Sequence, residues 1–134
     1  MSAPLRTTFA ALAVLTLSGC GTNAADAVKA KMQQFANATA DHDYATICKQ
    51  VLAPDLLAHL SATGVTCEQA WQLALGAVKN PYISVGKITV KGSKATAIVL
   101  SVATNQRSSL NAIGLVKTGS GWRIESLADQ LPGS

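Results

Sequence analysis

The hydrophobic period of this 134-residue chain changes at Asn80–Pro81, and that change constrains the fold more than any other feature. Before it, apolar residues recur every three or four positions, as they do along one face of a helix. After it, apolar and polar residues alternate, as in strands that bury one face. Helices followed by a meander of strands predict a single α+β domain, with N-terminal helices packed on a four-stranded antiparallel sheet.

Four helices are expected before this change, over residues 23–40, 43–52, 53–62 and 66–79. The first carries an apolar stripe at spacings of four, three and four, formed by Val28, Met32, Phe35 and Thr39. Asp43 suits the N-cap of the second helix, and Pro54 suits the first turn of the third. Thr66 and Gln69 match a capping box at the start of the fourth, which Asn80–Pro81 ends.

Four strands are expected after this change, over residues 83–90, 95–102, 110–117 and 122–127. The alternation slips across Gly86–Lys87, which predicts a β-bulge at Gly86. Residues 91–94 have the composition of a hairpin turn. The segment 95–102 is apolar on both faces, so it is a central strand or a strand that covers an interface.

A short apolar run near the N-terminus is typical of an export signal. It covers residues 8–17, contains no charge and follows a segment whose charged side chain is Arg6. Ten residues of helix rise about 15 Å, half of the roughly 30 Å core of a bilayer. The run is therefore too short to span a membrane and has the size of a signal-peptide core.

The run ends in Leu17-Ser18-Gly19-Cys20, which resembles the lipobox of bacterial lipoproteins. In that family the cysteine is lipidated and cleavage leaves it as the mature N-terminus. The resemblance implies that residues 1–19 are a signal peptide, that Cys20 carries the lipid and that residues 20–23 form a short tether. The protein would then be anchored in the cell membrane, on its extracytoplasmic side. The alternative is an ordinary secretory signal that leaves Cys20 free.

Assigning Cys20 to the lipid leaves Cys48 and Cys67 in an oxidising compartment, where two cysteines usually pair. A redox pair usually has Cys-x-x-Cys spacing, which is absent. A zinc site needs three or four ligands, and His42 and His59 would have to complete it. A structural disulfide is therefore the favoured reading, with no metal or cofactor expected.

Several short patterns run through the chain from residue 43 onward: Asp43-x-x-x-x-Cys48, Leu56-Leu57, Cys67-Glu68-x-Ala70, Ile88-x-Val90-x-Gly92, and 115–117 followed by 121–124. With the order of helices and strands, they resemble the NTF2-like superfamily, and most closely its small actinobacterial lipoproteins. The resemblance implies a curved sheet wrapped around the helices as a cone, over residues 24–134. It also implies that the two cysteines tie neighbouring helices together.

Enzymes of that superfamily use an Asp or His in the pocket as a proton-transfer base, which makes Asp41, His42 and His59 weak catalytic candidates. The alternative for Asp41-His42-Asp43 is an exposed turn in which Asp43 caps a helix. The alternative for His59 is a partly exposed position on a short helix.

Charge is unevenly distributed along the chain. Residues 79–124 hold seven Lys and Arg and no acid, whereas residues 20–78 hold three Lys and five acids. The basic half could face anionic headgroups or cell-wall polymers, or it could keep strand edges from pairing. The formal charge of +4 is too mild to favour nucleic acid as a partner.

These observations lead to one main hypothesis and two alternatives. The main one is a lipid-anchored extracytoplasmic protein whose domain binds a small apolar ligand or a neighbouring envelope protein, without catalysis. The first alternative is an isomerase or dehydratase that uses a pocket Asp or His. The second is a structural envelope protein that forms a homodimer through its sheet, along the segment 95–102.

Overall fold

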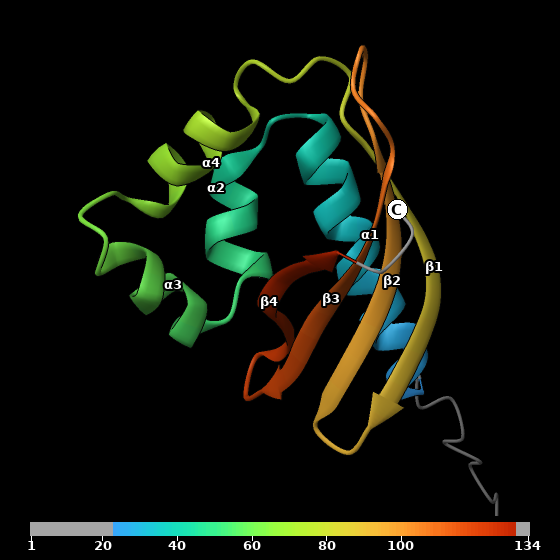
Figure 1. Cartoon of the computed structure of the whole chain (residues 1–134). Coiled ribbons are helices and arrows are strands. Elements are labelled where there is room, and N and C mark those ends of the chain that lie inside the picture. The colour runs from blue at the N-terminus through green and yellow to red at the C-terminus, as the bar shows by residue number, and fades with distance from the viewer. Residues whose placement is uncertain (1–22, 131–134) are drawn as a thin grey trace, which may run out of the picture.

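The computed structural model describes residues 23–130, which form helices packed against a curved four-stranded antiparallel sheet (Figure 1). The strands lie in the order β1 (Tyr82–Lys91), β2 (Lys94–Val102), β3 (Ser109–Thr118) and β4 (Gly121–Gln130). The α+β class and the meander are thus confirmed, and the arrangement is consistent with an NTF2-like fold. The expected signal peptide and Cys20 lie outside the described residues.

The helical half consists of α1 (Ala24–Ala40), α2 (Tyr44–Thr46), the π-helix η1 (Ile47–Val51), α3 (Pro54–Ser61) and α4 (Cys67–Leu75). The single α-helix expected over residues 43–52 is therefore wrong, because the chain forms one α-turn and then widens into a π-helix. The wide turn brings Ile47, Val51 and Leu52 together on the buried side, where each is 0% exposed. The fourth helix also ends earlier than expected, because Gly76 follows Leu75 and glycine disfavours helix continuation.

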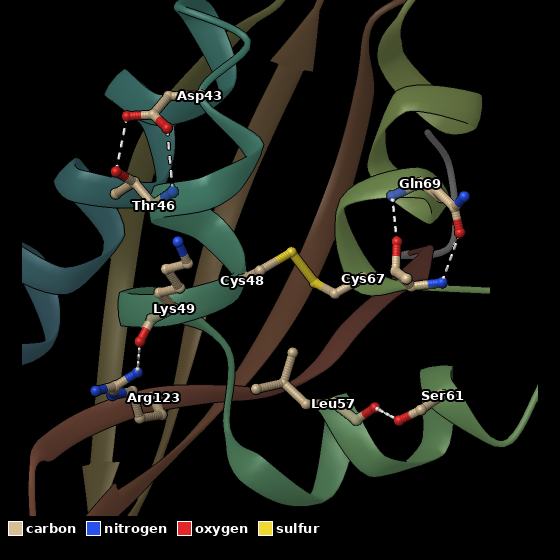
Figure 2. The surroundings of a disulfide bond; sticks show 10 residues. Asp43, Thr46, Cys48, Lys49, Leu57, Ser61, Cys67, Gln69 and Arg123 are labelled. Atoms are coloured by element: carbon tan, nitrogen blue, oxygen red, sulfur yellow. Dashed lines mark hydrogen bonds between the residues drawn. A yellow bond between two sulfur atoms is a disulfide. The ribbon is translucent and has the colours of Figure 1, made fainter.

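The caps expected from the sequence are present. The Asp43 carboxylate accepts hydrogen bonds from the backbone and hydroxyl of Thr46, and so begins α2. At α4, the Thr66 hydroxyl accepts from the Gln69 backbone N–H while the Gln69 side chain accepts from the Thr66 N–H. Figure 2 shows both caps. Each satisfies backbone donors that a helix N-terminus leaves unpaired.

The core lies between α1 and the inner face of the sheet. The stripe Val28, Met32 and Phe35 is almost fully buried, at 0%, 0% and 3% exposed. It meets alternate side chains of the two central strands, which are Ala95, Ala97, Val99, Ile113 and Leu115. The predicted β-bulge is confirmed as a register shift between Val85 and Ile88. The shift keeps apolar residues on the inner face of β1 on both sides of the bulge.

The strand β2 lies between β1 and β3, as one of the two readings of its doubly apolar pattern predicted. Its outward-facing Leu100 lies opposite Leu110 of β3, and the two side chains are 41% and 38% exposed. The dimer expected through this face stays a prediction.

A disulfide joins Cys48 of η1 to Cys67 at the start of α4, with the two Cα atoms 6.0 Å apart (Figure 2). Helix α4 has no fully buried residue, and its leucine Leu73 is 80% exposed. Burial therefore contributes little to holding α4 in place. The disulfide and an edge-to-face contact between Trp71 and Phe35 fix its position instead.

Replacing both cysteines (Cys48→Ser with Cys67→Ser) should lower the free energy of unfolding by about 3 kcal/mol, since the bond closes a loop of 19 residues. Urea denaturation monitored by circular dichroism measures the loss. A reductant should shift the midpoint of the native protein toward that of the double variant and leave the variant unchanged. Equal midpoints for the two oxidised proteins would contradict a stabilising bond.

Candidate functional site

A cavity of about 410 Å³ opens at the end of the domain where α1 ends. Phe35 and Thr39 of α1 form one wall, and Trp71 and Leu75 of α4 form a second. The third wall is the inner face of the sheet near the start of β1 and the loop between β2 and β3. The volume is within the range of about 300–1,000 Å³ that is typical of small-molecule sites.

The walls of the cavity are mainly apolar. The Trp71 ring meets the edge of Phe35, with 5.8 Å between centroids and 67° between planes. Aliphatic side chains from the α4–β1 connection and the sheet complete the lining, including Val78, Pro81, Ile83, Val99 and Ile113. Such walls favour a ligand that buries apolar surface.

Two buried polar side chains, Thr39 and Asn111, interrupt this apolar lining. They are 3% and 8% exposed, and no other described polar side chain is as fully buried. The Thr39 hydroxyl has no hydrogen-bond partner, whereas Nδ2 of Asn111 donates to Ser109 Oγ over 2.9 Å. Sequence reasoning placed Thr39 on an apolar stripe and overlooked Asn111. The sequence signal for both residues is a polar side chain at a position where the other residues of the same face are apolar.

The three catalytic candidates lie outside this cavity. Asp41 and His42 are exposed at the turn between α1 and α2, where His42 adopts a left-handed φ of 54°. The His42 ring nitrogen Nε2 lies 3.2 Å from the Val78 carbonyl oxygen. His59 is exposed on α3. Among the described side chains, no carboxylate or imidazole lines the cavity.

The neighbouring Asp43 has a structural task. Hydrogen bonds from the side chain and backbone of Thr46 favour its charged form and lower the pKa of the Asp43 carboxyl. The Asp41-His42-Asp43 segment is thus a turn with a capping carboxylate. Within residues 23–130, no group of three or more His, Cys, Asp or Glu is placed to hold a metal ion.

The cationic side chains of Lys31 and Arg123 bind carbonyl groups at the end of η1 and do not line the cavity. Lys31 Nζ donates to the Gln50 carbonyl over 2.9 Å. Arg123 Nη1 donates to the Lys49 carbonyl over 3.0 Å, as Figure 2 shows. Burial lowers the pKa of Lys31, and the nearby positive charge of Arg123 lowers it further. Both cations satisfy carbonyls that the end of a helix leaves unpaired.

Comparison with known proteins supports the fold. No protein-family model matches the sequence, and no curated protein matches it significantly. The crystal structure of the Kfla4162 protein from Kribbella flavida is similar, with a TM-score of 0.55 and 13% identity, over 78% of this chain and 90% of that one. A protein described as a "putative aromatic ring hydroxylase" from Novosphingobium aromaticivorans has a TM-score of 0.54 and 15% identity, over 84% and 94% of the two chains. At such identities the likeness shows a shared fold alone.

None of the helices between residues 23 and 130 is long and apolar enough to cross a bilayer.

Acid should weaken the fold through Asp43. Because its folded-state pKa is lowered from the ordinary value of 3.8, the ionised carboxylate stabilises the native state. This contribution is fully present above the unfolded pKa and is lost as the pH falls through the lower folded pKa. We therefore expect Asp43→Ala to flatten the fall in melting temperature between about pH 5 and pH 2. Asp41→Ala, which removes a neighbouring charge and leaves the cap, should keep the native slope. Parallel curves for Asp43→Ala and the native protein would refute the assignment.

Proposed function

We propose that this protein is a lipid-anchored extracytoplasmic protein of the NTF2-like type, whose domain binds a small, mainly apolar ligand without catalysis. One observation carries the proposal: an apolar cavity of about 410 Å³ whose walls include a buried hydroxyl without a partner. A cavity that resulted only from imperfect packing would have no need of an unpaired hydroxyl in its wall.

The lining supports binding over proton-transfer chemistry. An isomerase or dehydratase needs a general base within reach of its substrate. Asp41, His42 and His59 do not line the cavity, and the described lining offers hydroxyl, amide and guanidinium groups in their place. These groups can orient a ligand but are poor general bases at neutral pH.

The proposed anchoring rests on the sequence before residue 23, namely the apolar run 8–17 and the lipobox pattern that ends at Cys20. The Cys48–Cys67 disulfide agrees with export, because such bonds persist in oxidising compartments. Helix α1 is 17 residues long, or about 25 Å, and the cavity opens at its far end. A lipid attached before α1 would therefore lie at the end of the helix opposite to the cavity, which favours access by soluble ligands.

The anchor is tested by Cys20→Ala in a bacterial host that processes lipoproteins. We expect the native protein to incorporate labelled palmitate and partition into the detergent phase, and the variant to do neither. The double variant Cys48→Ser with Cys67→Ser serves as the control, because it removes the two other cysteines and leaves the lipobox intact. Equal labelling of the native protein and the Cys20 variant would overturn the proposed anchor.

The binding role is tested by filling the cavity from α4. Ala74 lines the cavity at an exposed position, so Ala74→Trp should occupy the space without disturbing the core. A panel of small aromatic and aliphatic compounds should raise the melting temperature of the native protein, since a ligand at 100 times its Kd adds about 2.7 kcal/mol. Ala74→Trp should abolish the shift.

The adjacent Leu73→Trp is the matched control, because Leu73 is 80% exposed and does not line the cavity. It should keep the ligand-induced shift. Shifts that are absent throughout the panel, or that survive in Ala74→Trp, would count against the proposed pocket.

A further inference from the structure

The two most buried polar side chains of the described residues stand on different walls of the same cavity. Thr39 projects from the last turn of α1, and Asn111 lies on the inner face of β3, opposite Val99 of β2. Burying a polar group without a hydrogen bond costs about 1–3 kcal/mol. Their presence together in a mainly apolar cavity therefore points to a ligand that pairs with them.

Their free hydrogen-bonding capacity defines what that ligand must offer. A helical threonine can donate to the carbonyl four residues earlier, but Thr39 makes no such bond and its Oγ1 has no partner. The amide of Asn111 donates through Nδ2 to Ser109 Oγ and approaches the Ser109 carbonyl at 3.5 Å. Because a carbonyl only accepts, this contact assigns Nδ2 to that side and leaves Oδ1 as an acceptor without a partner among the described residues.

A hydroxyl group has the hydrogen-bonding capacity that either side chain needs. Its proton can be donated to Asn111 Oδ1, and its oxygen can accept the proton of Thr39. A carboxylate lacks the proton that Oδ1 requires and brings a charge that no buried side chain of the described lining balances. The cationic lining residue is Arg107, which is exposed in the loop between β2 and β3 and not buried with this pair. Placing an unpaired charge beside Thr39 would be strongly unfavourable.

We infer that the ligand is an uncharged molecule with an apolar body and a hydroxyl group, which is held inside the cavity by Thr39 and Asn111. This inference rests on the proposed function, because it assigns a ligand class to the same pocket. The apolar body packs against Phe35 and Trp71, which fits an aromatic or alicyclic alcohol.

The test compares three probes that share one ring system, namely naphthalene, 2-naphthol and 2-naphthoate. NMR titration of the domain at pH 7 gives the Kd of each. A net hydrogen bond contributes about 0.5–1.5 kcal/mol, so 2-naphthol should bind about 3- to 10-fold more tightly than naphthalene. 2-Naphthoate should bind most weakly of the three.

Variants then show whether Thr39 and Asn111 cause the tighter binding of 2-naphthol. Thr39→Val keeps the shape and removes a hydroxyl that supports no bond in the fold, so the variant should fold, and its preference for 2-naphthol over naphthalene should be smaller than that of the native protein. Thr39→Ser should restore the preference, and Asn111→Ala should weaken it independently. Thr96→Val makes the same change at an exposed position of β2 outside the cavity and should leave all three Kd values unchanged.

The outcomes separate the ligand class from the existence of the pocket. Equal binding of naphthalene and 2-naphthol, or a preference that is undiminished in Thr39→Val, would overturn the inference and leave the proposed pocket standing. Tightest binding of 2-naphthoate, lost in Arg107→Gln, would place an acid at the loop and also overturn it. If none of the three probes binds, the proposed pocket itself fails.

Discussion

The packing of α1 along the inner face of the sheet is the contact on which the rest of the structure depends. Its apolar stripe meets the central strands, so both the helix and the sheet bury the face that neither could leave in water. The helix of 17 residues is about 25 Å long, whereas a strand of 10 residues extends about 33 Å. The strands are therefore longer than the helix, and the cavity lies at the end of the domain where α1 ends.

What encloses the uncovered part is α4, which buries none of its own residues fully. An element that is only partly buried contributes little stability by itself, and the covalent link to η1 adds to its contacts with the core. The bond from Cys48 to Cys67 positions the helix that carries Trp71 and Leu75 over the cavity. The geometry of the pocket thus depends on an oxidised disulfide, which agrees with a protein that works outside the cytoplasm.

The sequence patterns that predicted the fold correctly are local ones. The N-cap at Asp43, the capping box at Thr66 and the bulge at Gly86 each follow from residues within a few positions of one another. The π-helix was missed, because the turn widens to bury Ile47, Val51 and Leu52 together and this depends on what packs against it. The end of α4 was set too late, because Asn80–Pro81 is a stronger signal than the glycine at which the helix stops.

The cavity could not be predicted for a related reason. Periodicity shows that Phe35 and Thr39 share the face of α1 with Met32, but not whether a side chain or an open space stands opposite. That depends on the relative lengths of α1 and the strands and on the position of α4. The sequence favours Asp41-His42-Asp43 as a candidate site, because it is the densest polar cluster in the chain. The informative polar residues were instead single ones within apolar segments.

A buried hydroxyl without a partner is difficult to explain as packing alone. Valine has nearly the same shape as threonine, and at position 39 it would avoid the cost of about 1–3 kcal/mol for an unpaired polar group. The rest of the α1 stripe follows the rule for a helix face that meets a core, with Val28 and Met32 fully buried. The departure occurs at Thr39, the last position of the stripe, where the helix lines the cavity. Local rules of stability are broken most often where a molecule must bind something else, and this coincidence supports the proposal that the pocket binds a ligand.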